Sequence, residues 1–226
     1  MKVVLDIETD GFNPSKIHCI VAKNIDTNLV TIFDPDTLYS FNSWANTVDK
    51  FIMHNGLSFD APVLNRLLGT GITPDKIIDT LILSQLFNPI REKGHSLRAW
   101  GEKLSMLKGG EDVNFSKYDF NMLKYCKQDV EITHAVYKEL IKESTGFSQE
   151  CSDLEHNIRL ILDQQEKNGF AFDMKKAQQL LAILKEDIYD LEQWSLEEFD
   201  PTVIEMKTKT KEIPFNIGSR QQIADR

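Results

Sequence analysis

Short apolar runs alternate with amphipathic stretches over the first part of the chain. The β-branched run at 2–5 predicts a buried strand, and two further runs joined by a polar turn predict a hairpin beside it. The expected strands are 2–5, 17–23, 29–33, 51–54 and 76–79, and the expected helices between and after them are 58–71 and 80–87. Short strands interleaved with helices predict an α/β domain with a mixed central sheet flanked by helices.

Helical spacing dominates the rest of the chain. Ser96 is expected to cap a helix over 97–104, and apolar positions predict another helix over 119–143. Two strongly charged helices follow, one ending at Asn168 and one capped by Asp173. We therefore expect an α/β domain over residues 1–146 and a helical segment over 147–226.

The end of the chain has a different pattern. Residues 206–213 alternate basic and other residues as a strand or loop does, and 219–226 resemble a helix start without its body. We expect the chain to be a fragment of a longer protein, with partial disorder beyond about Pro201.

Composition excludes some classes of protein. Of 226 residues, 41% are hydrophobic and 27% are charged, as in ordinary soluble proteins. The formal net charge of -9 disfavours a protein that coats nucleic acid or an anionic membrane, although a nucleic-acid enzyme remains allowed if metal ions offset its acids. The three cysteines do not form a zinc motif, and neither a leader nor an apolar run of membrane-spanning length is present. A cytoplasmic protein that does not enter a membrane is the expected class.

Two carboxylates interrupt the first apolar strand. Asp6 and Glu8 are two residues apart, so their side chains point to the same face of a strand. Neighbouring acids resist ionisation unless a cation lies between them. Taken alone, the pair indicates a strand end emerging into solvent as readily as a metal site.

Two other patterns are equally ordinary by themselves. Asp60 begins an apolar helix, where an acid is stabilised by the helix dipole, but Asn55 and Gly56 before it form a polar turn at a strand end, where sites in α/β sheets tend to form. Tyr125 and Asp129 are four residues apart on a helix and share one face, as many solvated pairs do.

The order and spacing of the three patterns are more specific. Asp6-x-Glu8 on the first strand, Asn55-x3-Phe59-Asp60 at a helix start and Tyr125-x3-Asp129 on a later helix resemble the three exonuclease motifs of the DEDDy family. Residues 53–64 and 78–86 resemble the exonuclease domain of family A DNA polymerases of short-tailed phages, and 165–173 and 214–223 resemble the segments that lead into the polymerase thumb. Motifs of the palm and fingers do not follow.

The resemblance implies a ribonuclease H-like fold and a 3′–5′ proofreading exonuclease, without polymerase activity in this chain. It implies that Asp6, Glu8, Asp60 and Asp129 bind two divalent ions, Mg²⁺ or Mn²⁺, and that Tyr125 orients the attacking water. An unperturbed phenol has a pKa of about 10, which suits orientation better than proton abstraction. Thr9, Asn55 and, more weakly, His54 match positions that contact the terminal nucleotide.

The implied setting is that of a replication enzyme. The substrate would be a single-stranded DNA 3′ end, delivered from a primer-template duplex by the missing polymerase domain. The protein would be a monomer in the cytoplasm of an infected bacterial host. Two alternatives stay open, a stand-alone exoribonuclease of the RNase D kind and a catalytically silent structural module.

Four other residues are expected to be structural. Asp79 should cap the helix that follows it, and His95 should cap a helix or lie on the surface. Trp100 and Phe59 should belong to the core rather than stack on bases.

Overall fold

The computed structural model describes residues 1–106, 113–206 and 209–225. Clustering of contacts divides the chain into two compact units, Met1–Asn168 and Gly169–Arg226.

A mixed sheet forms the centre of the first unit. Its strands are β1 (Lys2–Thr9), β2 (Ile17–Asn24), β3 (Val30–Phe33), β4 (Lys50–Met53) and β5 (Ile77–Asp79). They lie in the order β3-β2-β1-β4-β5, with the β1–β2 and β2–β3 pairs antiparallel and the β1–β4 and β4–β5 pairs parallel. The predicted hairpin and strands are confirmed. Because β1, β4 and β5 are parallel, their carboxyl ends meet at the same edge of the sheet, where ligands bind in α/β sheets.

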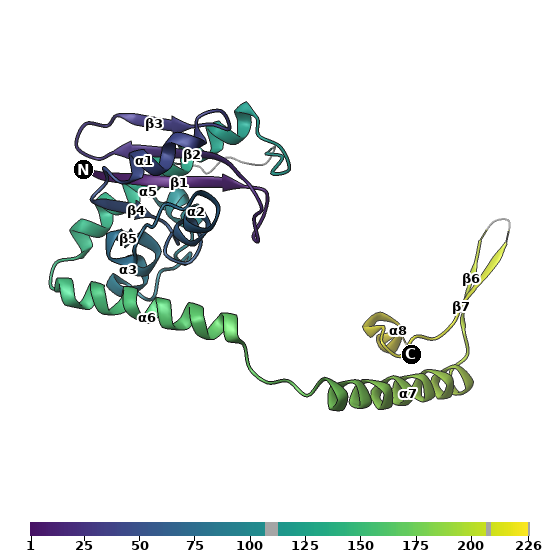
Figure 1. Cartoon of the computed structure of the whole chain (residues 1–226). Helices are drawn as coiled ribbons and strands as arrows, with labels where there is room; N and C mark the ends of the chain where they lie inside the picture. The colour runs from purple at the N-terminus through teal and green to yellow at the C-terminus, as the bar shows by residue number, and fades with distance from the viewer. Residues whose placement is uncertain (107–112, 207–208, 226) are drawn as a thin grey trace. The chain divides into compact units, whose positions relative to one another are not determined.

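Helices cover both faces of this sheet (Figure 1). They are α1 (Phe41–Ala45), α2 (Asp60–Leu68), α3 (Thr80–Phe87), α4 (Leu97–Lys103), α5 (Phe120–Glu143) and α6 (Gln149–Asn168), with short 3₁₀ turns at Leu38–Ser40 and Pro74–Lys76. Leu5 and Ile7 belong to a core cluster with residues of α1 and α2, whereas Val4 packs in a second cluster with Met122 and Val130 of α5. Alternation along β1 therefore sends its even positions, Asp6 and Glu8 among them, toward α5.

Local signals in the sequence set the helix ends. The Ser96 hydroxyl accepts a hydrogen bond from the Ala99 amide, and the Asp119 carboxylate accepts one from the Met122 amide, as expected of N-caps. Gly69 ends α2 in the left-handed conformation, with φ of +65°, which glycine adopts without a steric penalty.

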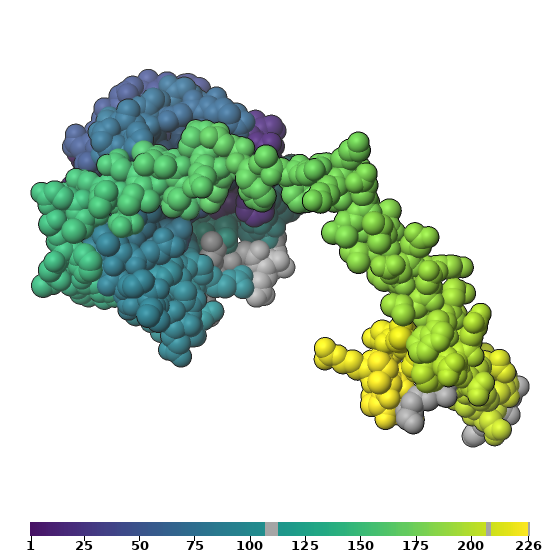
Figure 2. Space-filling view, turned by 90° about the horizontal axis from the view of Figure 1, so that it is seen from below, coloured from purple at the N-terminus to yellow at the C-terminus, as the bar shows by residue number. Residues whose placement is uncertain are grey.

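The first unit continues past the boundary expected near residue 146. Helix α6 is joined to it by a 2.7 Å hydrogen bond from the Ser58 hydroxyl to Asp163 and a 2.9 Å bond from the Asp79 amide to His156. Leu160 also packs against the core cluster that contains Leu5. Figure 2 shows α6, in green, lying across one face of this unit. The helical pattern of 149–168 does not reveal this attachment, because its partners are scattered over earlier elements.

The second unit contains α7 (Met174–Glu198), a hairpin of β6 (Thr202–Glu205) and β7 (Thr210–Ile213), and α8 (Arg220–Ala224). Asp173 caps α7 by accepting a hydrogen bond from the Lys176 amide. Beyond Pro201, where the sequence predicts partial disorder, the described residues form this hairpin and α8; Lys207 and Thr208 of the basic run lie outside them. Among the helices described in either unit, not one has the length and apolar character needed to cross a membrane.

Candidate active site

A cleft of about 640 Å³ opens at the carboxyl ends of β1 and β4. Elements from distant parts of the chain form it: the end of β1, the turn after β4, the start of α2 and one face of α5. It brings together the eight residues predicted from the three motifs, namely Asp6, Glu8, Thr9, His54, Asn55, Asp60, Tyr125 and Asp129. Ile7, Gly11, Phe12, Phe59 and Phe115 complete the lining.

The acids of β1 and α5 lie in the interior of this cleft. Glu8 is 6% exposed and Asp129 is 3% exposed, while Asp6 is half-buried. The pairing of β1 with β2 shifts register between Glu8 and Thr9, and such irregularities redirect side chains at the ends of strands. On α5, Tyr125 and Asp129 share the face that the four-residue spacing predicts.

The carboxyl of Asp60 is strongly perturbed. Burial, followed by the negative charge of Asp79, raises its pKa to about 7, even though hydrogen bonds from the backbone of Asp60 and Ile7 lower it. A buried acid near a second acid holds its proton unless a cation is supplied. Asp60 is therefore poised to change its charge when a metal ion binds.

The donor set fits divalent ions with a preference for oxygen. One ligand atom each from Asp6, Glu8 and Cys126 can be chosen so that all lie within 4.8 Å of one another. Burial raises the pKa of the Cys126 thiol well above its usual range, and the thiol donates to Asp6 Oδ2 at 3.5 Å. A protonated thiol is a hydrogen-bond donor rather than a ligand, so the carboxylates remain the metal ligands that fit. Sequence reasoning missed Cys126, because a cysteine in an apolar helix stripe is usually core.

The turn after β4 brings His54 and Asn55 into the cleft. Asn55 has a φ of +65°, a conformation that side-chain-bearing residues rarely adopt. Asp79 accepts a hydrogen bond from the Leu81 amide, which confirms its predicted role as the cap of α3. The same carboxylate also accepts hydrogen bonds from the amides of Asn55 and Leu57, which the cap prediction did not include.

Aromatic rings form part of the cleft wall. Phe115 meets Tyr125 edge to face, with ring centroids 6.1 Å apart, and the Phe115 carbonyl is hydrogen-bonded by the buried ring of His18 at 3.0 Å. Phe59, expected in the core, packs against the core cluster and lines the cleft as well. Phe12 is fully exposed. From the sequence alone, an apolar residue beside a motif that lines a cleft looks the same as one that is buried in the core.

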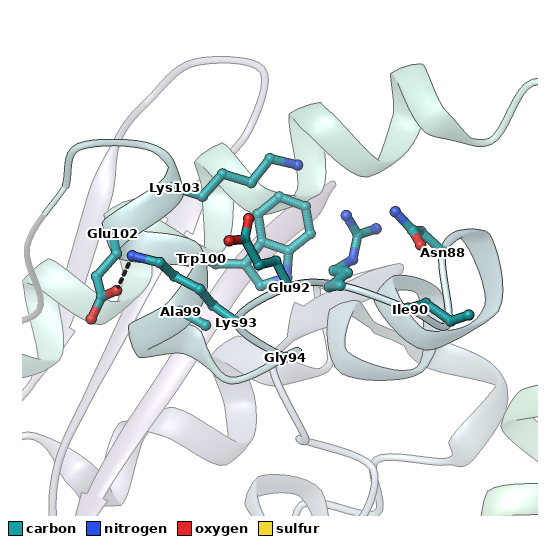
Figure 3. A pocket seen from close by; sticks show the side chains of 10 residues that line it. Asn88, Ile90, Glu92, Lys93, Gly94, Ala99, Trp100, Glu102 and Lys103 are labelled. Atoms are coloured by element: carbon teal, nitrogen blue, oxygen red, sulfur yellow. Dashed lines mark hydrogen bonds and ion pairs between the residues drawn. The ribbon is translucent and has the colours of Figure 1, made fainter.

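A second pocket of about 370 Å³ is lined by the loop that follows α3, residues 88–94, and by α4 (Figure 3). Trp100 is 1% exposed there, with the Arg91 guanidinium 4.4 Å and the Lys103 ammonium 4.5 Å from its ring centroid. Arg91 and Lys103 pair with Glu143, and Lys93 pairs with Glu102. These pairs mark a structural role, so the prediction that Trp100 is core is confirmed. The ring of His95 is hydrogen-bonded to the Ser84 hydroxyl and to the Pro89 carbonyl.

Two phage proteins are similar to this chain in sequence. The DNA-directed DNA polymerase of Escherichia phage T7 is 26% identical over 79% of this chain and 34% of the polymerase. The DNA-directed DNA polymerase of Enterobacteria phage T3 is 27% identical over the same shares. Over most of its length, this chain resembles phage DNA polymerases in sequence. It spans about a third of the length of the curated relatives it matches. A search of protein-family models finds no match.

Solved structures share the fold. Brucella melitensis NrnC bound to pGG matches with a TM-score of 0.55 and 20% identity, over 76% of this chain and 90% of NrnC. Escherichia coli RNase D, an exoribonuclease involved in structured RNA processing, matches with a TM-score of 0.54 and 18% identity, over 75% of this chain and 46% of RNase D. These likenesses confirm the predicted ribonuclease H-like fold, a mixed sheet flanked by helices.

Proposed function

We propose that this chain is the 3′–5′ exonuclease part of a phage-type family A DNA polymerase and removes nucleotides from the 3′ end of single-stranded or frayed DNA. The observation that carries the proposal is the convergence of four carboxylates and a tyrosine, from positions 6 to 129, in a cleft at the carboxyl edge of the sheet. The similarity to two phage DNA polymerases supports DNA as the substrate class.

Asp6, Glu8, Asp60 and Asp129 would hold two divalent ions, with Mg²⁺ or Mn²⁺ expected from the oxygen donors. When bound, such ions supply an activated water and offset the charge that develops on the leaving 3′ oxygen. The role of the ions explains why four acids, three of them less than a tenth exposed, are kept in a shared cleft.

The remaining cleft residues orient the reactants. Tyr125 positions the attacking water through its hydroxyl, and the edge contact with Phe115 restricts its ring. Thr9, His54 and Asn55 contact the terminal nucleotide. Cleavage of the last phosphodiester bond then releases a nucleoside monophosphate. Polymerase segments outside this chain would deliver the duplex end to the cleft. The chain itself would act as a monomer.

The test is a gel assay of a 5′-labelled single-stranded DNA and an RNA of the same sequence, each with Mg²⁺, Mn²⁺ or EDTA. The natural chain is compared with Asp6→Asn and with Asp26→Asn, a matched acid-to-amide change in an exposed turn. Metal-dependent shortening of DNA from the 3′ end, lost in Asp6→Asn and kept in Asp26→Asn, is the expected result.

Two outcomes would contradict the proposal. Shortening of the RNA but not the DNA would favour the exoribonuclease alternative, since the 2′-hydroxyl separates the two substrates. Failure of the folded, metal-loaded natural chain to cut either strand would favour the silent structural module.

A further inference from the structure

Two adjacent residues at the start of α3 are directed toward the turn after β4. Asp79 is 1% exposed and Thr80 is fully buried. The parallel register sets Met53, the last residue of β4, opposite Asp79, the last residue of β5. The residues that follow the two strands are therefore neighbours, although 26 positions separate His54 from Thr80.

The carboxylate of Asp79 holds the backbone of this turn. Oδ1 accepts hydrogen bonds from the Asn55 and Leu81 amides, each at 2.9 Å, and Oδ2 accepts one from the Leu57 amide at 3.0 Å. Three N–H groups thus converge on two acceptor oxygens. An amide in place of the carboxylate has one acceptor oxygen and presents N–H to an N–H, so it cannot reproduce this set.

The hydroxyl of Thr80 holds the ring of His54. It donates its proton to the Met53 carbonyl at 3.0 Å. Since a hydroxyl has a single proton, the 2.9 Å contact with His54 Nδ1 is one in which Thr80 accepts and Nδ1–H donates. This bond selects the tautomer of His54 that carries its proton on Nδ1.

The turn combines a left-handed residue, Asn55, with close packing of Gly56 against Met53. Asn55 has a φ of +65°, and a Cβ added to Gly56 would lie 2.2 Å from the Met53 Cβ. Conformations of this kind persist where surrounding contacts determine them.

We propose that Asp79 and Thr80 are positioning residues for the substrate, Asp79 setting the backbone of the Asn55 turn and Thr80 setting the orientation and tautomer of His54. The inference rests on the proposed function, in which His54 and Asn55 contact the terminal nucleotide. The start of α3 would therefore contribute to binding of that nucleotide rather than to the bond-breaking step.

The experiment compares Thr80→Val, which removes the hydroxyl at nearly constant volume, with Thr80→Ser, which retains it. Imidazole nitrogen NMR of the folded, metal-free chain reports the tautomer of His54, and steady-state cleavage of single-stranded DNA separates KM from kcat. Thr80→Val is expected to abolish the Nδ1–H tautomer signal and to raise KM roughly fivefold to tenfold, with kcat within about threefold. Thr80→Ser should restore both properties.

Asp79→Asn provides a second variant, with Asp75→Asn, an exposed acid four residues earlier, as its control. Faster hydrogen exchange of the Asn55 and Leu57 amides together with a raised KM is expected in Asp79→Asn alone. An unchanged His54 tautomer in Thr80→Val, or a loss confined to kcat, would overturn the positioning role. If the natural chain cuts no nucleic acid, the proposed function fails, and the NMR and exchange measurements still decide whether these residues set the turn.

Discussion

Asp60→Asn should stabilise the metal-free protein and inactivate the metal-loaded one. Burial and the negative charge of Asp79 raise the pKa of Asp60 to about 7, compared with 3.8 for an unperturbed aspartate. In the folded protein the group holds a proton that the unfolded chain releases above about pH 4. The contribution of Asp60 to stability is therefore fully present below about pH 4 and is lost as pH rises through about 7.

The size of the effect follows from the two pKa values. They differ by roughly three pH units, and each unit corresponds to about 1.4 kcal/mol, so ionisation of Asp60 costs at most about 4 kcal/mol of unfolding free energy above pH 7. Asp79 is among the causes of the shift, and a buried amide also needs hydrogen-bond partners. We expect Asp60→Asn to raise the free energy of unfolding by about 2 to 4 kcal/mol at pH 8 in EDTA and to leave it nearly unchanged at pH 4.

Hydrogen exchange of the amides in β1 and β4 is a suitable assay, because it reports the opening of the first unit alone. The natural chain, Asp60→Asn and the exposed control Asp75→Asn are measured in EDTA from pH 4 to pH 8, with exchange rates corrected for intrinsic pH dependence. Added Mg²⁺ should stabilise the natural chain and have much less effect on Asp60→Asn. Parallel stability curves for the natural chain and Asp60→Asn across this range would refute the reasoning.

Three other substitutions test separate parts of the structure. Tyr125→Phe should lower kcat by about 10²-fold with little change in KM, because the hydroxyl orients the attacking water and does not hold the bound nucleotide. Single-turnover cleavage measures the rate of the chemical step. An unchanged rate would contradict the role of the hydroxyl. Gly56→Ala should lower the free energy of unfolding by about 1 to 3 kcal/mol, since the added Cβ would lie 2.2 Å from the Met53 Cβ, and it should also weaken DNA binding. Urea unfolding measures the first effect and a binding titration the second. Values equal to those of the natural chain would contradict the tight packing of this turn. Trp100→Ala should lower the free energy of unfolding by about 3 to 5 kcal/mol, because the ring is fully buried and its indole N–H donates to the Ser84 hydroxyl at 3.0 Å. A loss below about 1 kcal/mol in urea unfolding would argue against a core role for the ring.

The element pattern was readable from the chain because it depends on neighbours in sequence. Alternation and β-branching marked β1, β2 and β4, the caps Ser96 and Asp173 marked the starts of their helices, and apolar spacing marked α5. The candidate site was readable for a different reason, since the three motifs matched a known family in order and spacing. Spacing alone did not place Asp6 near Asp129.

Contacts across the sheet were not readable in this way. The second role of Asp79, the thiol of Cys126 beside Asp6 and the attachment of α6 through His156 depend on which distant segments meet. A capping acid and an acid that holds a turn have the same local sequence. Only the parallel pairing of β4 with β5 distinguishes them, because it sets Met53 beside Asp79.

The sequence by itself determined the strands and the helices with their caps, because these features depend on backbone preferences and side-chain periodicity within a few residues. The set of acids stays a prediction from the order and spacing of three motifs that resemble a known family. The tertiary structure decided the raised pKa of Asp60, the support of the Asn55 turn and the boundary at Asn168. Each of these depends on burial and on partners brought together by the sheet, because desolvation and hydrogen bonding act through space and not along the chain.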